Sequence, residues 1–117
     1  MSRFVAALLI GLCFSSPSFA SDPRPRAWCG WYMRHLLGGV ADRTYNLARN
    51  WAHFGSPAPG PQLGVLVVWN HHVGLITNRT ATGWVIKSGN DGHRVRERER
   101  SVRGAIAFRW PNRMAGL

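Results

Sequence analysis

The chain has 117 residues, of which 45% are hydrophobic, with 13 glycines and 6 tryptophans, a composition typical of one globular domain and not of a disordered or repetitive chain. Lysine and arginine number 15 against 5 acidic residues, which gives a formal net charge of +10. This surplus favours polyanionic partners, and it is equally compatible with a role in solubility and general surface adhesion alone.

Residues 1–20 have the pattern of a secretory signal peptide. Arg3 supplies the positive charge, residues 4–14 form an apolar stretch too short to span a bilayer, and Ser18-Phe19-Ala20 is a small-x-Ala cleavage site. We therefore expect an exported protein, periplasmic or extracellular, that consists of residues 21–117 with a formal charge of +9. No second long apolar segment follows Ala20, so the sequence predicts no transmembrane segment after signal cleavage.

The first half of the exported chain predicts helices. Residues 21–26 form a Pro/Arg-rich leader, expected to be extended, and residues 27–117 form the single domain. Apolar positions at helical spacing predict a helix over residues 28–37, which Gly38-Gly39 ends. A second helix is predicted over residues 44–54 with Thr44 as its N-cap.

The second half predicts strands. A nearly continuous apolar run at residues 63–69 suits a strand covered on both faces, and residues 73–77, 84–86 and 104–110 are further strands. Residues 94–100 alternate in charge and are expected to form a solvated edge strand or loop. Helices first and a meander of strands afterwards predict an α+β fold, with N-terminal helices packed on an antiparallel sheet.

Three residues carry the candidate chemistry. Cys29 opens the first predicted helix, where unpaired backbone N–H groups and the helix dipole favour the thiolate. His72 opens a strand 43 residues later, and Asn90 lies 18 residues beyond it, just after the next strand. Antiparallel neighbours place His72 beside Asn90, so the pattern predicts a nucleophile, its base and a residue that orients the imidazole.

Each of these residues also has a structural interpretation. Cys13 falls in the signal segment, which leaves Cys29 without a partner for a disulfide within the exported chain. Cys29 is then a buried small hydrophobe, pairs with another chain, or is a reactive thiol. His71 is an alternative base, but adjacent strand residues face opposite sides, so only one of the two histidines meets Cys29. Asn90 also suits a turn that needs left-handed backbone angles.

The motifs resemble those of the CHAP domains, the cysteine, histidine-dependent amidohydrolases/peptidases, within the NlpC-type papain-like superfamily. The matching pieces are Cys29-Gly30-Trp31-Tyr32, His72-Val73-Gly74, the second-helix pattern of residues 46–55, Gly89-Asn90 and Phe108-Arg109-Trp110-Pro111. The resemblance implies a papain-like fold and hydrolysis of peptidoglycan by an amidase or endopeptidase, with Cys29 as nucleophile, His72 as base and Asn90 as the orienting residue. It implies no cofactor.

The alternative is a non-catalytic module that binds anionic envelope polymers through its arginines. Nucleic acid is the weaker partner, because residues 94–100 lack aromatic side chains interleaved with their arginines. Three histidines and Asp91 lie near one loop, but their spacing fits no common zinc pattern, so we predict no metal site.

Overall fold

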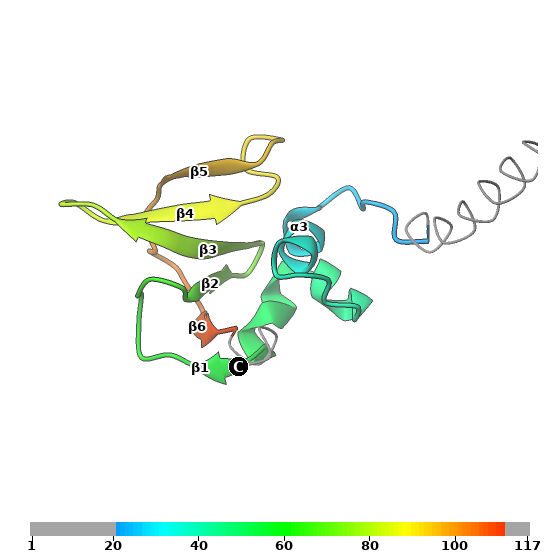
Figure 1. Ribbon diagram of the computed structural model, residues 1–117, viewed down its shortest axis with the longest axis horizontal. Coiled ribbons are helices and arrows are strands. Elements are labelled where there is room, and N and C mark those ends of the chain that lie inside the picture. The colour runs from blue at the N-terminus through cyan, green and yellow to red at the C-terminus, as the bar shows by residue number, and fades with distance from the viewer. Residues whose placement is uncertain (1–20, 112–117) are drawn as a thin grey trace, which may run out of the picture.

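The computed structural model describes residues 21–111; the predicted signal peptide with Cys13 lies outside the described residues. A helical part comes first and a sheet follows (Figure 1). The helices are α3 (Cys29–Leu36) and two 3-10 helices, η2 (Arg43–Asn46) and η3 (Ala48–His53). The strands are β1 (Ser56–Pro57), β2 (Leu66–Trp69), β3 (His72–Arg79), β4 (Trp84–Ser88), β5 (Arg96–Glu99) and β6 (Ala107–Trp110).

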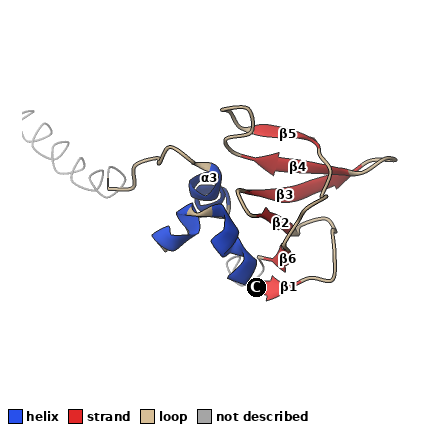
Figure 2. Ribbon diagram, turned by 180° about the vertical axis from the view of Figure 1, so that it is seen from behind, coloured by secondary structure: helices blue, strands red, loops and turns tan. Residues whose placement is uncertain are grey.

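The strands form one six-stranded sheet in the order β1-β6-β2-β3-β4-β5, with every neighbouring pair antiparallel. The helices gather together beside the sheet, with α3 near the start of β3 (Figure 2). The predicted α+β class with an antiparallel sheet is therefore confirmed. None of the helices in the part of the chain that the structure describes has the length and apolar run needed to cross a membrane.

β2 and Val65, the residue just before it, are buried on both faces of the sheet, as the apolar run predicts. Leu66 and Val68 pack with α3 and the 3-10 helices in one cluster. Val65 and Val67 belong to a second cluster on the opposite face, which contains Ile76 and is covered by tryptophans of the sheet itself. Successive side chains point to opposite faces of the sheet, so this one segment contributes to two apolar cores.

The first helix agrees with the sequence prediction. It begins at Cys29, and Trp28 caps it without a side-chain hydrogen bond. Gly38 and Gly39 end it with φ angles of 93° and 96°, in the left-handed region where glycine is favoured.

The second predicted helix is wrong. Residues 44–54 form no α-helix but parts of η2 and η3, which an extended Leu47 separates. Thr44 is not the cap: the carboxylate of Asp42 accepts hydrogen bonds from the Thr44 backbone N–H at 2.9 Å and from its hydroxyl at 2.7 Å. The N-cap is thus Asp42, two residues before Thr44, and the helix that it begins is the short 3-10 helix η2.

Two strand boundaries differ from prediction in ways that matter for the site. The Val65 N–H donates to the Gln62 carbonyl in a turn, so the strand predicted at residues 63–69 starts only at Leu66. The strand predicted at residues 84–86 runs two residues further, to Ser88, because its pairing with β3 and β5 continues. Residues 96–99 form β5, the edge strand that the alternating charges predict.

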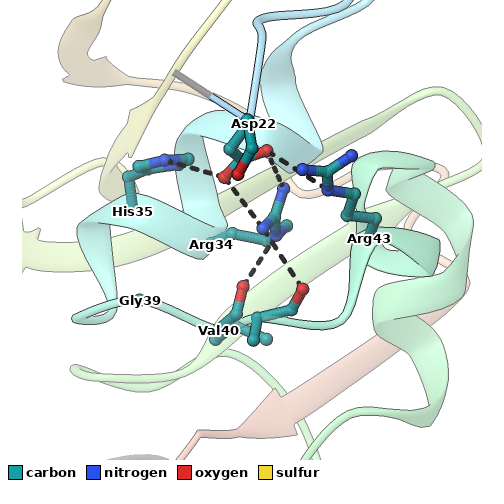
Figure 3. Close-up of a pocket in the computed structure, with 8 residues that line it drawn as sticks. Asp22, Arg34, His35, Gly39, Val40 and Arg43 are labelled. Carbon is teal, nitrogen blue, oxygen red and sulfur yellow. Dashed lines mark hydrogen bonds and ion pairs between the residues drawn. The ribbon is translucent and has the colours of Figure 1, made fainter. Parts of the chain in front are cut away.

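The leader is attached to α3 through Asp22. Buried Arg34 donates to both carboxylate oxygens of Asp22 at 2.9 Å, and it also reaches the Val40 carbonyl at 2.7 Å. Figure 3 shows Asp22 between Arg34, His35 and Arg43. These residues line a hollow of about 470 Å³. The charges of this hollow pair with one another, so we assign it a structural role: it holds residues 21–26 beside the helix that carries Cys29.

Candidate active site

The thiol of Cys29 lies against the first peptide groups of β3. Its Sγ donates to the His71 carbonyl at 3.7 Å, and the backbone N–H of Val73 also acts on the sulfur. These two groups flank His72 in the chain. The structure therefore brings the predicted nucleophile and the backbone of the predicted base together, although they are 43 residues apart.

Two glycines allow α3 to approach this closely. A Cβ on Gly30 would lie 2.3 Å from the Tyr45 carbonyl oxygen, and a Cβ on Gly89 would lie 2.5 Å from the Cβ of Tyr32. Real side chains do not tolerate such contacts, so glycine is required at both positions. Gly30 allows the start of α3 to pack against η2, and Gly89 allows it to pack against the end of β4.

His72 is held by the neighbouring strand. Its Nε2 lies 2.9 Å from the hydroxyl oxygen of Ser88, which ends β4 and is fully buried. Gly74 makes room for this diagonal contact, because a Cβ there would lie 3.4 Å from the Cβ of Ser88 and 2.4 Å from Ile86. The pairing of β3 with β4 thus fixes the imidazole at the end of the sheet nearest α3.

This contact engages Nε2 and leaves Nδ1 as the ring nitrogen without a bond to Ser88. When Nε2 carries the hydrogen, it donates to the Ser88 hydroxyl, and Nδ1 keeps a lone pair that can accept a proton. A general base needs such a lone pair, and its tautomer is fixed by the partner of the other nitrogen. The Ser88 hydroxyl can accept from Nε2 or donate to it, so the contact fixes the position of the ring and is compatible with the tautomer that a base requires.

Burial makes both groups neutral at rest. Cys29 is 4% exposed, and desolvation raises the pKa of its thiol, although the backbone N–H groups of Val73 and Gly30 act in the opposite direction. Burial and the Arg100 charge together lower the pKa of His72 to about 4. The sequence-based expectation that the helix terminus favours a resting thiolate is therefore wrong, because desolvation outweighs the backbone donors.

A charged cluster lies next to His72. Arg98 donates to both carboxylate oxygens of buried Asp91 at 2.9 Å, and this interaction holds the pKa of Asp91 below its ordinary value. Arg100 lies 3.4 Å from the same carboxylate and stacks over the ring of Trp69 at 4.9 Å. The Asp91 charge raises the pKa of His72, but burial and Arg100 prevail.

The remaining predicted residues have different surroundings. Asn90 lies in the bend after β4 with a φ of 53°, the left-handed angle that the turn interpretation requires. The hydrogen bond on the His72 ring comes from Ser88, so the catalytic role of Asn90 stays a prediction. His71 is exposed, and its carbonyl rather than its ring contacts the thiol, which favours His72 as the base.

Sequence reasoning missed Ser88 and the Asp91 cluster. Ser88 follows Ile86 by two residues and therefore faces the same side of β4, but it lies outside the strand predicted at residues 84–86. Asp91 was identified only as a loop residue, because its two arginine partners come from the run of alternating charges.

An open hollow of about 640 Å³ lies beside His72. Residues that line it include Trp69, His71, His72, Arg100, Ser101 and Arg103. Within residues 21–111, no three histidine, cysteine or acidic side chains are grouped so that they could hold a metal ion. Comparison with family models, curated proteins and solved structures found no match.

Proposed function

We propose that this chain is an exported cysteine hydrolase that cleaves amide bonds in peptidoglycan, as an amidase or an endopeptidase, on a papain-like fold of the CHAP type. The observation that carries the proposal is a chain of contacts. The Cys29 thiol lies on the peptide groups that flank His72, and the His72 imidazole is bonded through Nε2 to Ser88. Nucleophile, base and orienting group are the three parts of a thiol hydrolase.

The neutral pair sets the first chemical step. Nδ1 of His72 takes the thiol proton as the Cys29 sulfur attacks the substrate carbonyl carbon, and the backbone N–H of Cys29 donates to the resulting oxyanion. The imidazolium then gives its proton to the leaving amine as the C–N bond breaks. Water, deprotonated by His72, hydrolyses the acyl-enzyme and restores the thiol. These steps require no cofactor.

The test is the release of soluble fragments from purified peptidoglycan sacculi. Wild-type protein of residues 21–117 should release fragments, and Cys29→Ala should lower the rate by about a thousandfold or more, because the nucleophile is lost. The melting temperatures of both proteins serve as the folding control. Equal release by a folded Cys29→Ala variant would show that the thiol takes no part.

One observation favours the second candidate, a non-catalytic module that binds envelope polymers. The Cys29 thiol is 4% exposed and its pKa is raised, as expected of a packed cysteine with no chemical role. This candidate predicts retention on cell walls without release of fragments. Retention should then be indifferent to iodoacetamide treatment of the thiol.

A further inference from the structure

We propose that the hollow beside His72 binds a carboxylate of the peptide substrate through Arg100 and Arg103. This inference rests on the proposed function for the class of substrate. It adds a subsite and a specificity: a free carboxylate on the residues that adjoin the amide bond to be cut.

Arg100 is held in place before any ligand arrives. Its guanidinium lies over the Trp69 ring at 4.9 Å and 3.4 Å from an Asp91 oxygen, and its side chain is only 27% exposed. Asp91 already receives two shorter bonds from Arg98 at 2.9 Å. The contact from Arg100 is the looser one, so donors of its planar fork remain for an incoming anion.

Arg103 closes the same hollow from the next loop. Its backbone carbonyl accepts the hydrogen bond of the Trp69 indole N–H at 2.9 Å, which ties the loop to the wall of the hollow. Its exposed side chain forms no ion pair among the described residues. Trp69 thus contacts both arginines: its ring face lies under the Arg100 guanidinium, and its indole N–H holds the Arg103 backbone.

The local charge balance favours an anion. Arg100 and Arg103 line the hollow, and none of the residues that line it is acidic. The carboxylate of Asp91, which contacts Arg100, is also paired with Arg98. The acidic group closest along the chain, Glu99, is instead bonded to Thr80 and Thr82. A guanidinium fork matches a carboxylate through two parallel hydrogen bonds, and free carboxylates are a general feature of peptidoglycan peptides.

The position of the hollow determines which carboxylate is bound. His72 itself lines the hollow, and its ring lies 5.8 Å from that of Trp69. A ligand group on the two arginines is therefore within a residue or two of the amide presented to Cys29. Arg100 also lies close enough for its charge to lower the pKa of both His72 and the thiol.

Binding to a non-cleaving protein tests the subsite without relying on catalysis. The probes are a purified disaccharide tetrapeptide from peptidoglycan and the same compound with all its carboxyl groups converted to amides. By calorimetry, the Cys29→Ala protein should bind the carboxylate form about tenfold more tightly, the gain expected for one charge-assisted pair. Adding Arg103→Gln or Arg100→Gln should bring the ratio of the two dissociation constants towards one.

Arg79→Gln is the matched control. Arg79 stacks over Trp84 at 5.2 Å, so its substitution removes the same charge and the same kind of contact outside the hollow. The ratio should survive this change. A ratio near one in the Cys29→Ala protein, or an equal fall in Arg79→Gln and Arg103→Gln, would overturn the subsite.

Hydrolysis of the same two compounds separates the subsite from the enzyme proposal. If wild type cleaves both forms with the same kcat/KM, the proposed function stands and the subsite is refuted. If the carboxylate form binds preferentially and neither compound is cleaved, the subsite stands and the proposed function fails.

Discussion

At the scale of single residues, the hydroxyl of Ser88 holds the His72 imidazole through its Nε2 atom. Ser88 is fully buried at the end of β4, and its 2.9 Å contact with Nε2 fixes the ring position and leaves Nδ1 as the nitrogen that the proposed mechanism uses as the base. In the proposed mechanism Ser88 acts through the imidazole and is therefore a positioning residue. Its loss should change catalysis far more than stability.

Ser88→Ala should lower kcat/KM on peptidoglycan fragments by about tenfold, because the imidazole loses its orienting bond. Nitrogen NMR of His72 should show a changed shift for Nε2, the nitrogen that loses its hydrogen bond. Thr77→Val is the control, since the Thr77 hydroxyl is buried with no hydrogen-bond partner among the described residues. A similar loss of activity in both variants would mean that Ser88 contributes only packing.

The lowered pKa of His72 predicts a dependence of stability on pH. The unfolded chain takes up this proton near pH 6.5, whereas the folded protein does so only near pH 4. The neutral His72 therefore makes its full contribution to the free energy of unfolding above pH 6.5, and this contribution is lost as the pH falls from 6.5 to 4. After allowance for solvent screening, it amounts to about 2 kcal/mol.

Urea unfolding of wild type and His72→Gln at several pH values measures this effect. The difference in unfolding free energy between the two proteins should change within the window from pH 6.5 to 4. Asp22 and Asp91, whose pKa values are lowered, lose their contribution only below about pH 3.8. A His72 titration above pH 6.5 by NMR would instead indicate an ion pair with a Cys29 thiolate.

At the scale of elements, the site depends on how closely α3 approaches η2 and β4. Gly30, directly after Cys29, lies against backbone carbonyls of η2 that cannot move without displacing the 3-10 turn. The helix start, and with it the thiol, is thereby set by backbone packing. Glycine is therefore required at position 30 for steric reasons, independently of any chemistry at Cys29.

Gly30→Ala should lower the free energy of unfolding by about 3 kcal/mol, because a Cβ would lie 2.3 Å from a carbonyl oxygen. Gly60→Ala is the matched substitution: nothing lies within 4 Å of a Cβ there, so stability should be unchanged or slightly higher. Thermal unfolding of both variants provides the comparison. Equal melting temperatures would show that α3 can shift away from η2 at little cost.

The elements also show where sequence patterns suffice and where they do not. A continuous apolar run predicted β2, because this strand is buried on both faces. Apolar residues at helical spacing predicted α3, because this helix is buried along one stripe. The 3-10 turns were missed, because Asp42 competes with Thr44 as the cap and local sequence does not decide between them. The position of Cys29 and His72 was predictable from order along the chain. The Ser88 partner was not, because it depends on where strand pairing ends.

At the scale of the whole molecule, basic charge dominates. Residues 21–117 carry a formal +9, and the charge is spread along the chain, with seven of the 14 lysines and arginines after residue 90. Such a surplus attracts anionic polymers over distances beyond direct contact. Both candidate functions use this attraction, so binding to cell walls does not separate them.

Retention of the Cys29→Ala protein on purified sacculi should fall steeply from about 0.05 M to about 0.5 M salt, because the Debye length shortens over this range. The bound fraction after sedimentation measures it. Retention that is independent of salt would indicate that apolar or sugar-stacking contacts hold the protein on the wall.

The most direct test of the central claim is the mass of the protein during turnover. Wild type mixed with peptidoglycan fragments and quenched in acid should carry the acyl group on the tryptic peptide that contains Cys29, and Cys29→Ala should carry none. Fragments released at equal rates by both proteins, with no change in the mass of either, would contradict a cysteine hydrolase.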